Sequence, residues 1–320
     1  MKEEKKMWVA ENWKDYEILD TSEGEKLEKW GDYVLVRPDP QVIWDTPKGY
    51  DWKKINAHYH RSHEGGGSWE FINLPEVWKI NYGKLTFALK PFSFKHTGLF
   101  PEQAVNWDWM TQRLQNAIIN RRNSENAEGN SEPIKVLNLF AYTGGATCAC
   151  ALAGHKEGTD MSVKENYQVS VTHVDASKGM VGWAKENAAL SGMENAPIRW
   201  IVDDCVKFVE REIRRGNHYD AILMDPPSYG RGPKGETWKN EECIFNLVKL
   251  CMQLMSDKPV FFLINAYTTG LAPAVLKYML GLTMEKKYGG VTLSEEIGLR
   301  VKKTGLILPE GASGRWTTKE

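Results

Sequence analysis

The chain has 320 residues, of which 42% are hydrophobic and 26% are charged, a composition that excludes a largely disordered protein. This length suits one large α/β domain with a smaller one attached. No apolar run approaches the ~20 residues of a membrane helix, and residues 1–6 are charged, without the apolar segment of a secretory signal behind them. We therefore expect a cytoplasmic protein that has no membrane partner.

The net charge and the cysteine content say little about the function. The 41 basic residues are balanced by 42 acidic ones, so the global charge gives no support for nucleic-acid binding, which often accompanies a positive excess. Five cysteines without a CxxC pair favour neither a disulfide framework nor a zinc site.

The first 95 residues predict a small β-rich domain. Nine of the 13 tryptophans lie within the first 110 residues, and tryptophan usually packs in folded structure. Residues 33–37 alternate as a strand does, and residues 78–90 resemble two strands around an Asn-Tyr-Gly turn.

The rest of the chain predicts an α/β domain. Residues 101–119 read as a helix that has Pro101 near its start, and residues 121–131 are a polar, linker-like stretch. Short apolar strands then alternate with helices, which is typical of a parallel sheet covered on both faces. The expected strands are 135–140, 169–174, 198–202, 219–224 and 260–265, and the expected helices are 146–153, 178–191, 205–215, 243–255 and 272–280. Residues 291–308 could supply an antiparallel edge.

A glycine-containing turn follows the first of these strands. Ligands of open α/β sheets bind beyond the carboxyl ends of strands, and glycine lets the backbone approach a ligand closely. The turn is neither a GxGxxG nor a P-loop motif, which disfavours a dinucleotide or a triphosphate; a plain turn is the alternative. Its candidate ligand-binding residues are Phe140, Tyr142, Thr143, Gly144 and Gly145.

Acidic residues end the next two strands. Asp175 is placed to accept hydrogen bonds from the hydroxyls of a ribose, although it could also cap a helix, a task that Ser177 could perform instead. One of Asp203 and Asp204 could accept from an adenine amino group while the other caps the next helix, and spacing does not decide which.

The fourth strand is followed by Asp225-Pro226-Pro227-Ser228-Tyr229. Each proline fixes its own φ and restricts its predecessor, so the turn is rigid. Rigidity suits a backbone that must hold a reacting group in line, although prolines are also common structural residues at strand ends.

Taken in this order, the four motifs resemble those of the class I S-adenosylmethionine-dependent methyltransferases, and more closely the family of large-subunit ribosomal RNA cytosine methyltransferases. In that family Asn-Leu-Phe-x-Tyr-Thr-Gly-Gly is the cofactor loop and Asp-Pro-Pro follows strand four. The resemblance covers roughly residues 95–320. It implies a Rossmann-like methyltransferase sheet at 96–320 behind a β-rich domain at 1–95, S-adenosylmethionine as the cofactor, and RNA as the partner.

Further segments carry the same resemblance. Residues 95–103 are similar to the family's Lys-Thr-Gly-aromatic-x-x-x-Gln segment, which helps to cover the cofactor and implies roles for Thr97 and Gln103. Residues 27–41 and 304–316 resemble a bacterial subgroup of methyltransferases.

Two features depart from the family. Methylation at carbon 5 of cytosine needs a Cys nucleophile, which the family places after strand five, but residues 262–270 contain no Cys. We expect all five cysteines to be packing residues in helices or at the start of one. The second departure is at the N-terminus, where the RNA-binding module of the family is not recognisable.

Two further stretches could carry chemistry. Residues 230–239 form a basic, glycine-rich loop in which Arg231, Lys234 and Trp238 could meet a substrate together with Tyr229, or the loop is simply solvated. His58, His60 and His63 invite a metal site, but no carboxylate–histidine helix motif accompanies them. We expect exposed loop histidines and no metal.

The resemblance therefore implies an S-adenosylmethionine-dependent methyltransferase that acts on a ribosomal RNA base. The predicted catalytic residues are Asp225, Pro226, Pro227 and Tyr229. Asp-Pro-Pro-Ser-Tyr is one residue from the Asp-Pro-Pro-Tyr motif of exocyclic-amine methyltransferases, so methylation of an amine or of a small molecule is an alternative. A non-catalytic RNA-binding protein that retains the fold is another, and the oligomeric state is open.

Overall fold

The computed structural model describes residues 7–62, 66–92, 94–124, 132–231, 237–268 and 270–318. These residues divide into two compact units. The α/β unit comprises residues 106–296 and 311–318, and the β unit comprises residues 7–105 and 297–310.

The α/β unit is built on a sheet with five parallel strands at its centre. These strands are β9 (Ile134–Leu139), β10 (Val169–Asp175), β11 (Ile198–Val202), β12 (Ala221–Met224) and β15 (Phe261–Ala266). Two long strands, β16 (Val291–Arg300) and β17 (Ile307–Thr317), complete the order β16-β17-β15-β12-β9-β10-β11. β17 pairs with β15 in the antiparallel direction. The α/β class is confirmed, and the strand that pairs antiparallel with β15 uses residues 312–317, beyond the predicted edge at residues 291–308.

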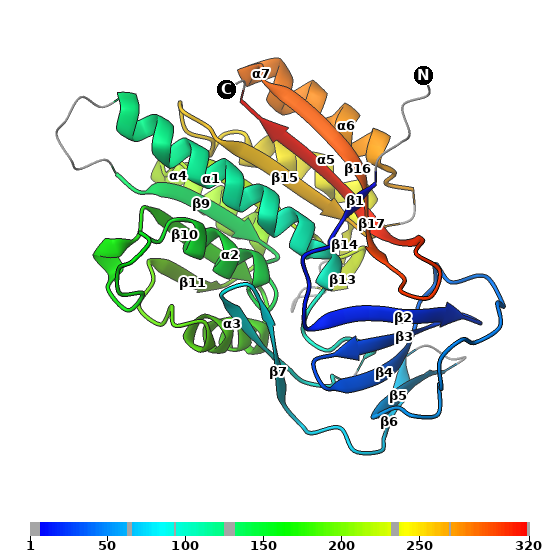
Figure 1. The fold of residues 1–320 in the computed structure, drawn as a ribbon. Helices are drawn as coiled ribbons and strands as arrows, with labels where there is room; N and C mark the ends of the chain where they lie inside the picture. Colours follow the sequence, from blue (N-terminus) through cyan, green and yellow to red (C-terminus); the bar gives the residue numbers. More distant parts are fainter. Residues whose placement is uncertain are drawn as a thin grey trace. The chain divides into compact units, whose positions relative to one another are not determined.

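Helices cover both faces of this sheet (Figure 1). α1 (Ala104–Ser124), α2 (Gly145–Ala153) and α3 (Lys178–Leu190) lie on one face. On the other face α4 (Cys205–Arg215), α5 (Asn240–Cys251) and α6 (Pro273–Leu280) bury alternate strand residues, among them Leu137, Leu139, Ile222, Met224, Phe262 and Ile264. A short π-helical turn (Gly281–Glu285) and α7 (Lys286–Tyr288) follow α6.

The predicted elements of the α/β unit agree with the structure to within a few residues. β11 and α4 match their predicted bounds, because Asp204 caps the start of α4 and Gly216, at φ 68°, ends it. The predicted helix at 101–119 is a short 3₁₀ turn (Pro101–Gln103) that continues into α1. A further 3₁₀ turn (Lys164–Asn166) precedes β10.

The β unit has a five-stranded sheet in the order β2-β3-β4-β5-β6. Its strands are β2 (Tyr16–Ser22), β3 (Glu25–Trp30), β4 (Tyr33–Pro38), β5 (Ala57–Arg61) and β6 (Gly67–Phe71). The predicted hairpin consists of β7 (Trp78–Tyr82) and β8 (Leu85–Leu89), and β1 (Trp8–Val9) pairs with residues 297–298. A β-rich N-terminal part is therefore confirmed.

Charged side chains are buried inside the β unit. Nζ of Lys26 lies 3.0 Å from Asp39 and 2.7 Å from Glu310, and Nε of Arg37 lies 2.6 Å from Glu28. Burial raises the pKa of the Glu310 carboxyl to about 8, although nearby Lys26 opposes the shift. Buried charges need partners of this kind, since an unpaired ion loses its hydration without compensation.

The division into units differs from the predicted domain boundary at residues 95/96. It falls between residues 105 and 106, and residues 297–310 group with the β unit. These later residues hydrogen-bond to β2, where the amides of Lys302 and Lys303 donate to the carbonyls of Ile18 and Leu19. Local sequence patterns do not reveal so distant a pairing.

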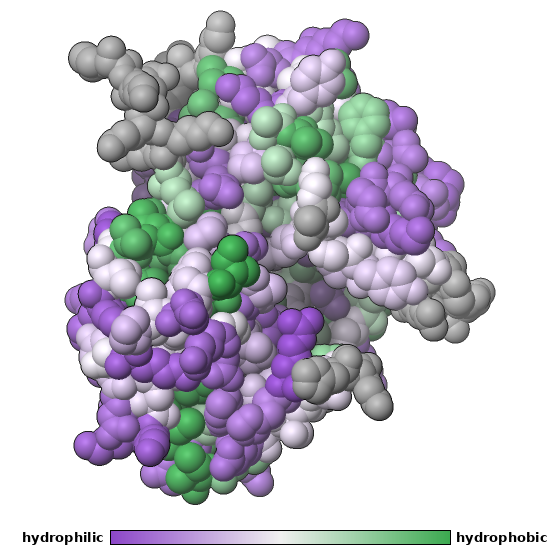
Figure 2. Space-filling model, turned by 90° about the vertical axis from the view of Figure 1, so that its right-hand side faces the viewer, coloured by the Kyte–Doolittle hydropathy of each residue, from purple (hydrophilic) through white to green (hydrophobic). Residues whose placement is uncertain are grey.

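On the face drawn in Figure 2, apolar residues form separate patches between polar ones. Over the described part of the chain, no helix combines the length and the apolar character that a membrane crossing requires.

Candidate active site

The candidate site lies at the carboxyl edge of the parallel strands. Numbered along the chain from β9, and leaving out the short edge strand β1, the strands of the sheet run 3-2-1-4-5-7-6, so the order reverses between β9 and its neighbour β12. Ligands of open α/β sheets bind in the crevice at such a reversal. The turns after β9 and β12 meet there, where the amide of Asp225 donates to the carbonyl of Leu139 at 3.4 Å.

The turn after β9 has an unusual backbone. Phe140 and Tyr142 have φ angles of 54° and 50°, and Gly144 has a φ of 84°. Non-glycine residues rarely adopt this region, and such backbone concentrates at functional sites.

Packing inside the protein requires the two glycines of this turn. A Cβ atom on Gly144 would lie 2.8 Å from Cβ of Ala184, and one on Gly145 would lie 2.6 Å from the Trp107 ring. The close approach that the sequence assigned to a ligand is made here by α3 and α1. A role against a ligand stays a prediction.

Asp175 holds this turn at the end of β10. Its carboxylate accepts from the amide of Tyr142 at 2.9 Å and from the amide of Ser177 at 2.8 Å. Ser177 caps α3 by accepting from the amide of Met180, so Asp175 is not the cap. Burial raises the pKa of the Asp175 carboxyl, and the two amide bonds oppose this shift. A carboxylate has about four acceptor positions, so capacity for a ligand remains.

The two acids after β11 have separate tasks. Asp204 caps α4, because its carboxylate accepts from the amide of Lys207 at 2.9 Å. Asp203 forms an ion pair with Arg211 and accepts from the amide of Asp204. The amide of Asp203 also donates to the carbonyl of Asp175 at 3.0 Å, which places Asp203 beside the carboxyl end of β10.

A buried polar network beneath the turn was not predicted. Asn138 donates to the hydroxyl of Thr147, which lies 2.9 Å from Nδ1 of His173. On the same face Asn187 donates to the carbonyl of Thr143 at 2.8 Å. These bonds tie α2 and α3 to the ends of β9 and β10. Asn138, Thr147 and His173 are polar residues within mostly apolar segments, which is a signal that the sequence offered, whereas Asn187 follows Lys185 and Glu186 and gives no such signal.

The buried imidazole of His173 makes stability depend on pH. Burial lowers its pKa to about 3, whereas the unfolded chain binds this proton near pH 6.5. Protons therefore favour the unfolded state, and stability should fall by about 1–2 kcal/mol from pH 7 to pH 5 through His173 alone. Chemical denaturation at several pH values should show a smaller loss for His173→Gln. Exposed His218→Gln is the control and should keep the wild-type slope; equal slopes for all three proteins would contradict the assignment.

The turn after β12 is joined to the turn after β9 by an aromatic contact. The indole of Trp238 donates to the carbonyl of Pro227 at 2.8 Å, and its ring lies 5.2 Å from the ring of Phe140. Pro226 is buried, whereas the Tyr229 side chain is 52% exposed and hence accessible to a flat partner.

The predicted loop at 230–239 is a hairpin at its base, so this expectation is corrected. β13 (Tyr229–Arg231) pairs with β14 (Thr237–Lys239), with Gly230 opposite Trp238. Three-residue strands with one aromatic give too little alternation to be recognised in sequence. Lys234 lies outside the described residues.

A second buried network joins β15 to α1 and β17. Asn265 and Ser313 both contact Asn106, which accepts two hydrogen bonds from the guanidinium of Arg315. The guanidinium also lies 5.1 Å from the centroid of the Trp109 ring. Burial lowers the pKa of Arg315 to about 9, although Asp108 opposes the shift. The network thus consists of amides, a hydroxyl and a guanidinium, and it contains no thiol.

Among solved structures, an S-adenosylmethionine-dependent methyltransferase from Agrobacterium tumefaciens is 34% identical, with a TM-score of 0.84 over 98% of this chain and 93% of that one. The chain belongs to the S-adenosylmethionine-dependent methyltransferases. The predicted class of enzyme and its cofactor are thereby confirmed. A Streptococcus mutans protein assigned to the same class shares the fold, with a TM-score of 0.66 at 15% identity over 96% and 76% of the two chains.

The ribosomal RNA large subunit methyltransferase K/L of Pseudoalteromonas atlantica is 30% identical over 199 residues, which are 62% of this chain and 23% of that protein. This methyltransferase chain thus spans about a quarter of the length of the curated relatives it matches. No protein-family model matches the chain.

The thiols of this methyltransferase are packed away. Cys148, Cys150, Cys205 and Cys251 are buried and lie in helices, and Cys243 lies in α5. Burial raises the pKa of the Cys148 thiol to about 12 and also raises the pKa values of Cys150, Cys205 and Cys251. Such thiols are poor nucleophiles, because the thiolate is the reactive form.

Two predicted cofactor contacts of the methyltransferase belong to the β unit. Thr97 is fully buried and its carbonyl accepts from the amide of Lys90, while Gln103 is buried in the 3₁₀ turn that leads into α1. Their predicted roles toward the cofactor therefore stay predictions.

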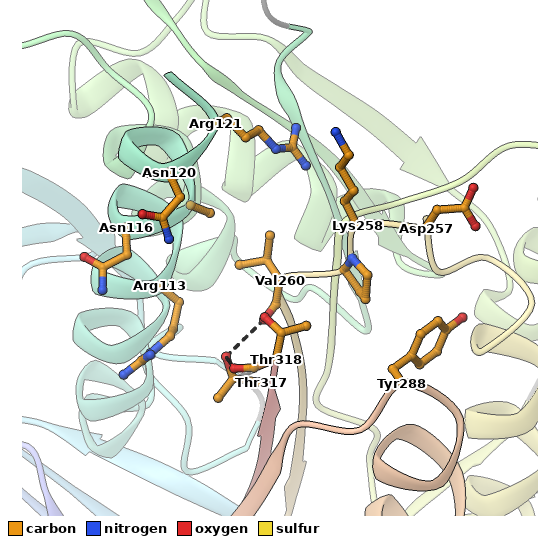
Figure 3. A pocket seen from close by; sticks show the side chains of 12 residues that line it. Arg113, Asn116, Asn120, Arg121, Asp257, Lys258, Val260, Tyr288, Thr317 and Thr318 are labelled. Atoms are coloured by element: carbon orange, nitrogen blue, oxygen red, sulfur yellow. Dashed lines mark hydrogen bonds between the residues drawn. The ribbon is translucent and has the colours of Figure 1, made fainter. Parts of the chain in front are cut away.

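A hollow of about 620 Å³ lies elsewhere in the α/β unit of this methyltransferase (Figure 3). Arg113, Asn120 and Arg121 of α1 line it together with Lys258 and Thr318. Lys258 lies shortly before β15, which begins at Phe261, so the hollow is at the amino-terminal end of the parallel strands. It is thus separate from the carboxyl edge described above.

Proposed function

We propose that this methyltransferase transfers a methyl group from S-adenosylmethionine to a base of ribosomal RNA in the cytoplasm. The observation that carries the proposal is the meeting of the β9 turn, Asp175 and the Asp225-Pro226 turn at the reversal of strand order. The RNA substrate is supported by the names of the curated relatives, of which this chain matches about a quarter.

The residues at this edge fit S-adenosylmethionine. The half-buried carboxylate of Asp175 suits the hydroxyls of a ribose, and it already fixes the turn of positive φ angles through Tyr142. Asp203 lies beside it and is the better placed of the two acids for an adenine amino group, since Asp204 caps α4. When bound, the cofactor supplies a methyl group on a positively charged sulfur.

The side chains after β12 would orient the acceptor. In our proposal the carboxylate of Asp225 and the carbonyl of Pro226 face the atom that receives the methyl group, and Tyr229 stacks on the base. The Pro227 carbonyl is occupied by the Trp238 indole, which holds the turn in place. Trp238 and Phe140 form an aromatic wall that would help to exclude water.

The acceptor atom is a nitrogen rather than carbon 5 of cytosine in this proposal. Thiolate addition has no support from the four buried cysteines or from residues 262–270, which contain no Cys. An acid and a proline carbonyl are both hydrogen-bond acceptors, and an exocyclic amine offers two donors. Methylation of a small-molecule amine is the second candidate. A non-catalytic RNA-binding protein is no longer a candidate, because the chain belongs to a family of methyltransferases.

The chemistry can be tested by trapping. RNA that contains 5-fluorocytosine should form no covalent adduct with the protein, because four of the five cysteines are buried in helices and residues 262–270 contain no Cys. Denaturing electrophoresis and mass spectrometry measure this directly. An adduct mapped to any of the five cysteines would restore methylation at carbon 5.

The substrate can be tested in cells. Ribosomal RNA from a strain that lacks the gene should lose one methylated base, and expression of the wild-type chain should restore it. Nucleoside mass spectrometry after nuclease digestion measures the mark. An unchanged set of methylated nucleosides would move the proposal to a small-molecule amine.

A further inference from the structure

The β unit carries a cluster of imidazoles and carboxylates on one exposed sheet face. The sequence placed His58 and His60 in a loop, but they lie on β5, so that expectation is wrong. They flank Tyr59, which is buried, and successive strand residues point to opposite faces. The two imidazoles therefore project from the same side of β5, with their ring centroids 4.0 Å apart.

Two other strands of the same sheet, β3 and β6, supply the carboxylates that the sequence did not reveal. In the antiparallel pair β5–β6, Glu70 lies directly opposite His58 and diagonal to His60. Nε2 of His60 is 2.8 Å from Oε2 of Glu70, and Nε2 of His58 is 2.6 Å from Oε1 of Glu25 on β3. Each imidazole thus has a carboxylate partner from another strand.

We propose that His58, His60 and Glu70 form a binding site for a divalent transition-metal ion, of which Zn²⁺ is the natural choice. One ligand atom from each residue lies within 4.8 Å of the others. Tetrahedral Zn²⁺ with bonds of about 2.0–2.2 Å holds its ligand atoms roughly 3.4 Å apart. Side-chain rotations that move each ligand atom by about 1 Å would therefore bring the three atoms to coordination distance. The side chains of His60 and Glu70 are more than half exposed and are free to make this movement.

The composition of the cluster matches this ion. Two imidazoles and a carboxylate are a common zinc set, which leaves a fourth position for water. Imidazole also binds Cu²⁺ and Ni²⁺, whereas Ca²⁺ and Mg²⁺ prefer oxygen ligands alone. Glu25 completes the surroundings, since a carboxylate bound to an imidazole orients the ring toward a metal.

A metal here would fasten the outer strands of the β-unit sheet. β6 ends the sheet order and has a neighbour on one side only, and the site would link it to β5 through side chains as well as through the backbone. An ion that binds the folded state alone stabilises that state in proportion to the logarithm of its concentration. The three proposed ligands all belong to the β unit, and the proposal of a metal site does not rest on the proposed methyl transfer.

The test is equilibrium binding of Zn²⁺ to the full chain without a histidine tag, measured by competition with a chromogenic chelator and by metal analysis after dialysis. We expect one ion per chain with a micromolar dissociation constant. His60→Ala and Glu70→Gln should each weaken binding by at least roughly tenfold, as expected on removal of one ligand. His218→Ala in the α/β unit should leave binding unchanged.

Co²⁺ provides a readout of the ligands that does not depend on folding stability. The wild-type chain should give the visible absorption of four-coordinate Co²⁺, and His60→Ala should lose it while retaining its circular dichroism spectrum. Less than half an ion per chain at 100 μM free Zn²⁺, roughly 100 times a micromolar dissociation constant, would overturn the proposal. Equal affinity in the wild-type chain and in the His58→Ala/His60→Ala double variant would also overturn it, and the pairs would then be hydrogen bonds alone.

Discussion

Replacing Asp225 with alanine should lower kcat by about 100-fold or more while the affinity for S-adenosylmethionine changes little. The reason is positional, because Asp225 follows β12 on the side of the proposed acceptor, whereas the proposed ribose contact is Asp175 on β10. Single-turnover kinetics with saturating cofactor measures the first quantity and titration calorimetry measures the second.

Two further variants separate orientation from general damage. Asp225→Asn keeps an acceptor oxygen and the same shape, so it should recover part of the lost rate. Asp257→Ala removes an exposed aspartate near the amino-terminal end of the parallel strands and should retain full activity. Loss of cofactor affinity in Asp225→Ala equal to its loss of rate would place Asp225 on the cofactor side instead.

Replacing Asp175 with alanine should weaken S-adenosylmethionine binding by about 1.5–3 kcal/mol, the range for hydrogen bonds to a charged group. This corresponds to roughly a 10- to 150-fold increase in the dissociation constant. The structure adds a second effect. Without the carboxylate, the amides of Tyr142 and Ser177 lose their acceptor, so the free energy of unfolding should fall by about 1–3 kcal/mol as well.

Ser177→Ala is the matched control for this variant. It removes the cap of α3 two residues away and should cost about 1 kcal/mol of stability, with the cofactor affinity intact. Calorimetry at a temperature where every variant is folded separates binding from stability. Wild-type affinity in Asp175→Ala would remove this residue from the proposed site.

The parallel sheet and the edge that carries the candidate site could be predicted from the sequence, because the local strand and helix patterns allow few topologies. Short apolar strands that alternate with helices have few arrangements, and the carboxyl ends of parallel strands share one edge. The motifs after β9, β10 and β12 could therefore be assigned to one site from the sequence. The sequence did not decide which of Asp203 and Asp204 caps α4 and which is available to the cofactor. Both roles require a carboxylate directly after β11, so the two residues are equivalent in sequence.

Features that depend on distant partners were not predictable. Asn106 and Arg315 are separated by 209 positions, and nothing local to either residue indicates the other. β2 and β3 were missed because their buried positions include Asp20 and Glu28, which break the apolar alternation that marks a strand. The carboxylates beside His58 and His60 come from β3 and β6, so a search for a local metal motif could not find them.

The central claim is methyl transfer to ribosomal RNA at the carboxyl edge of this sheet. The most direct measurement is incubation of the purified chain with S-adenosylmethionine labelled in its methyl group and ribosomal RNA from the deletion strain, followed by nuclease digestion and identification of the labelled nucleoside. We predict label on the exocyclic amine of one base, and almost none with Asp225→Ala. Label that appears equally with Asp225→Ala, or no label in RNA when the same protein binds the cofactor, would contradict the account.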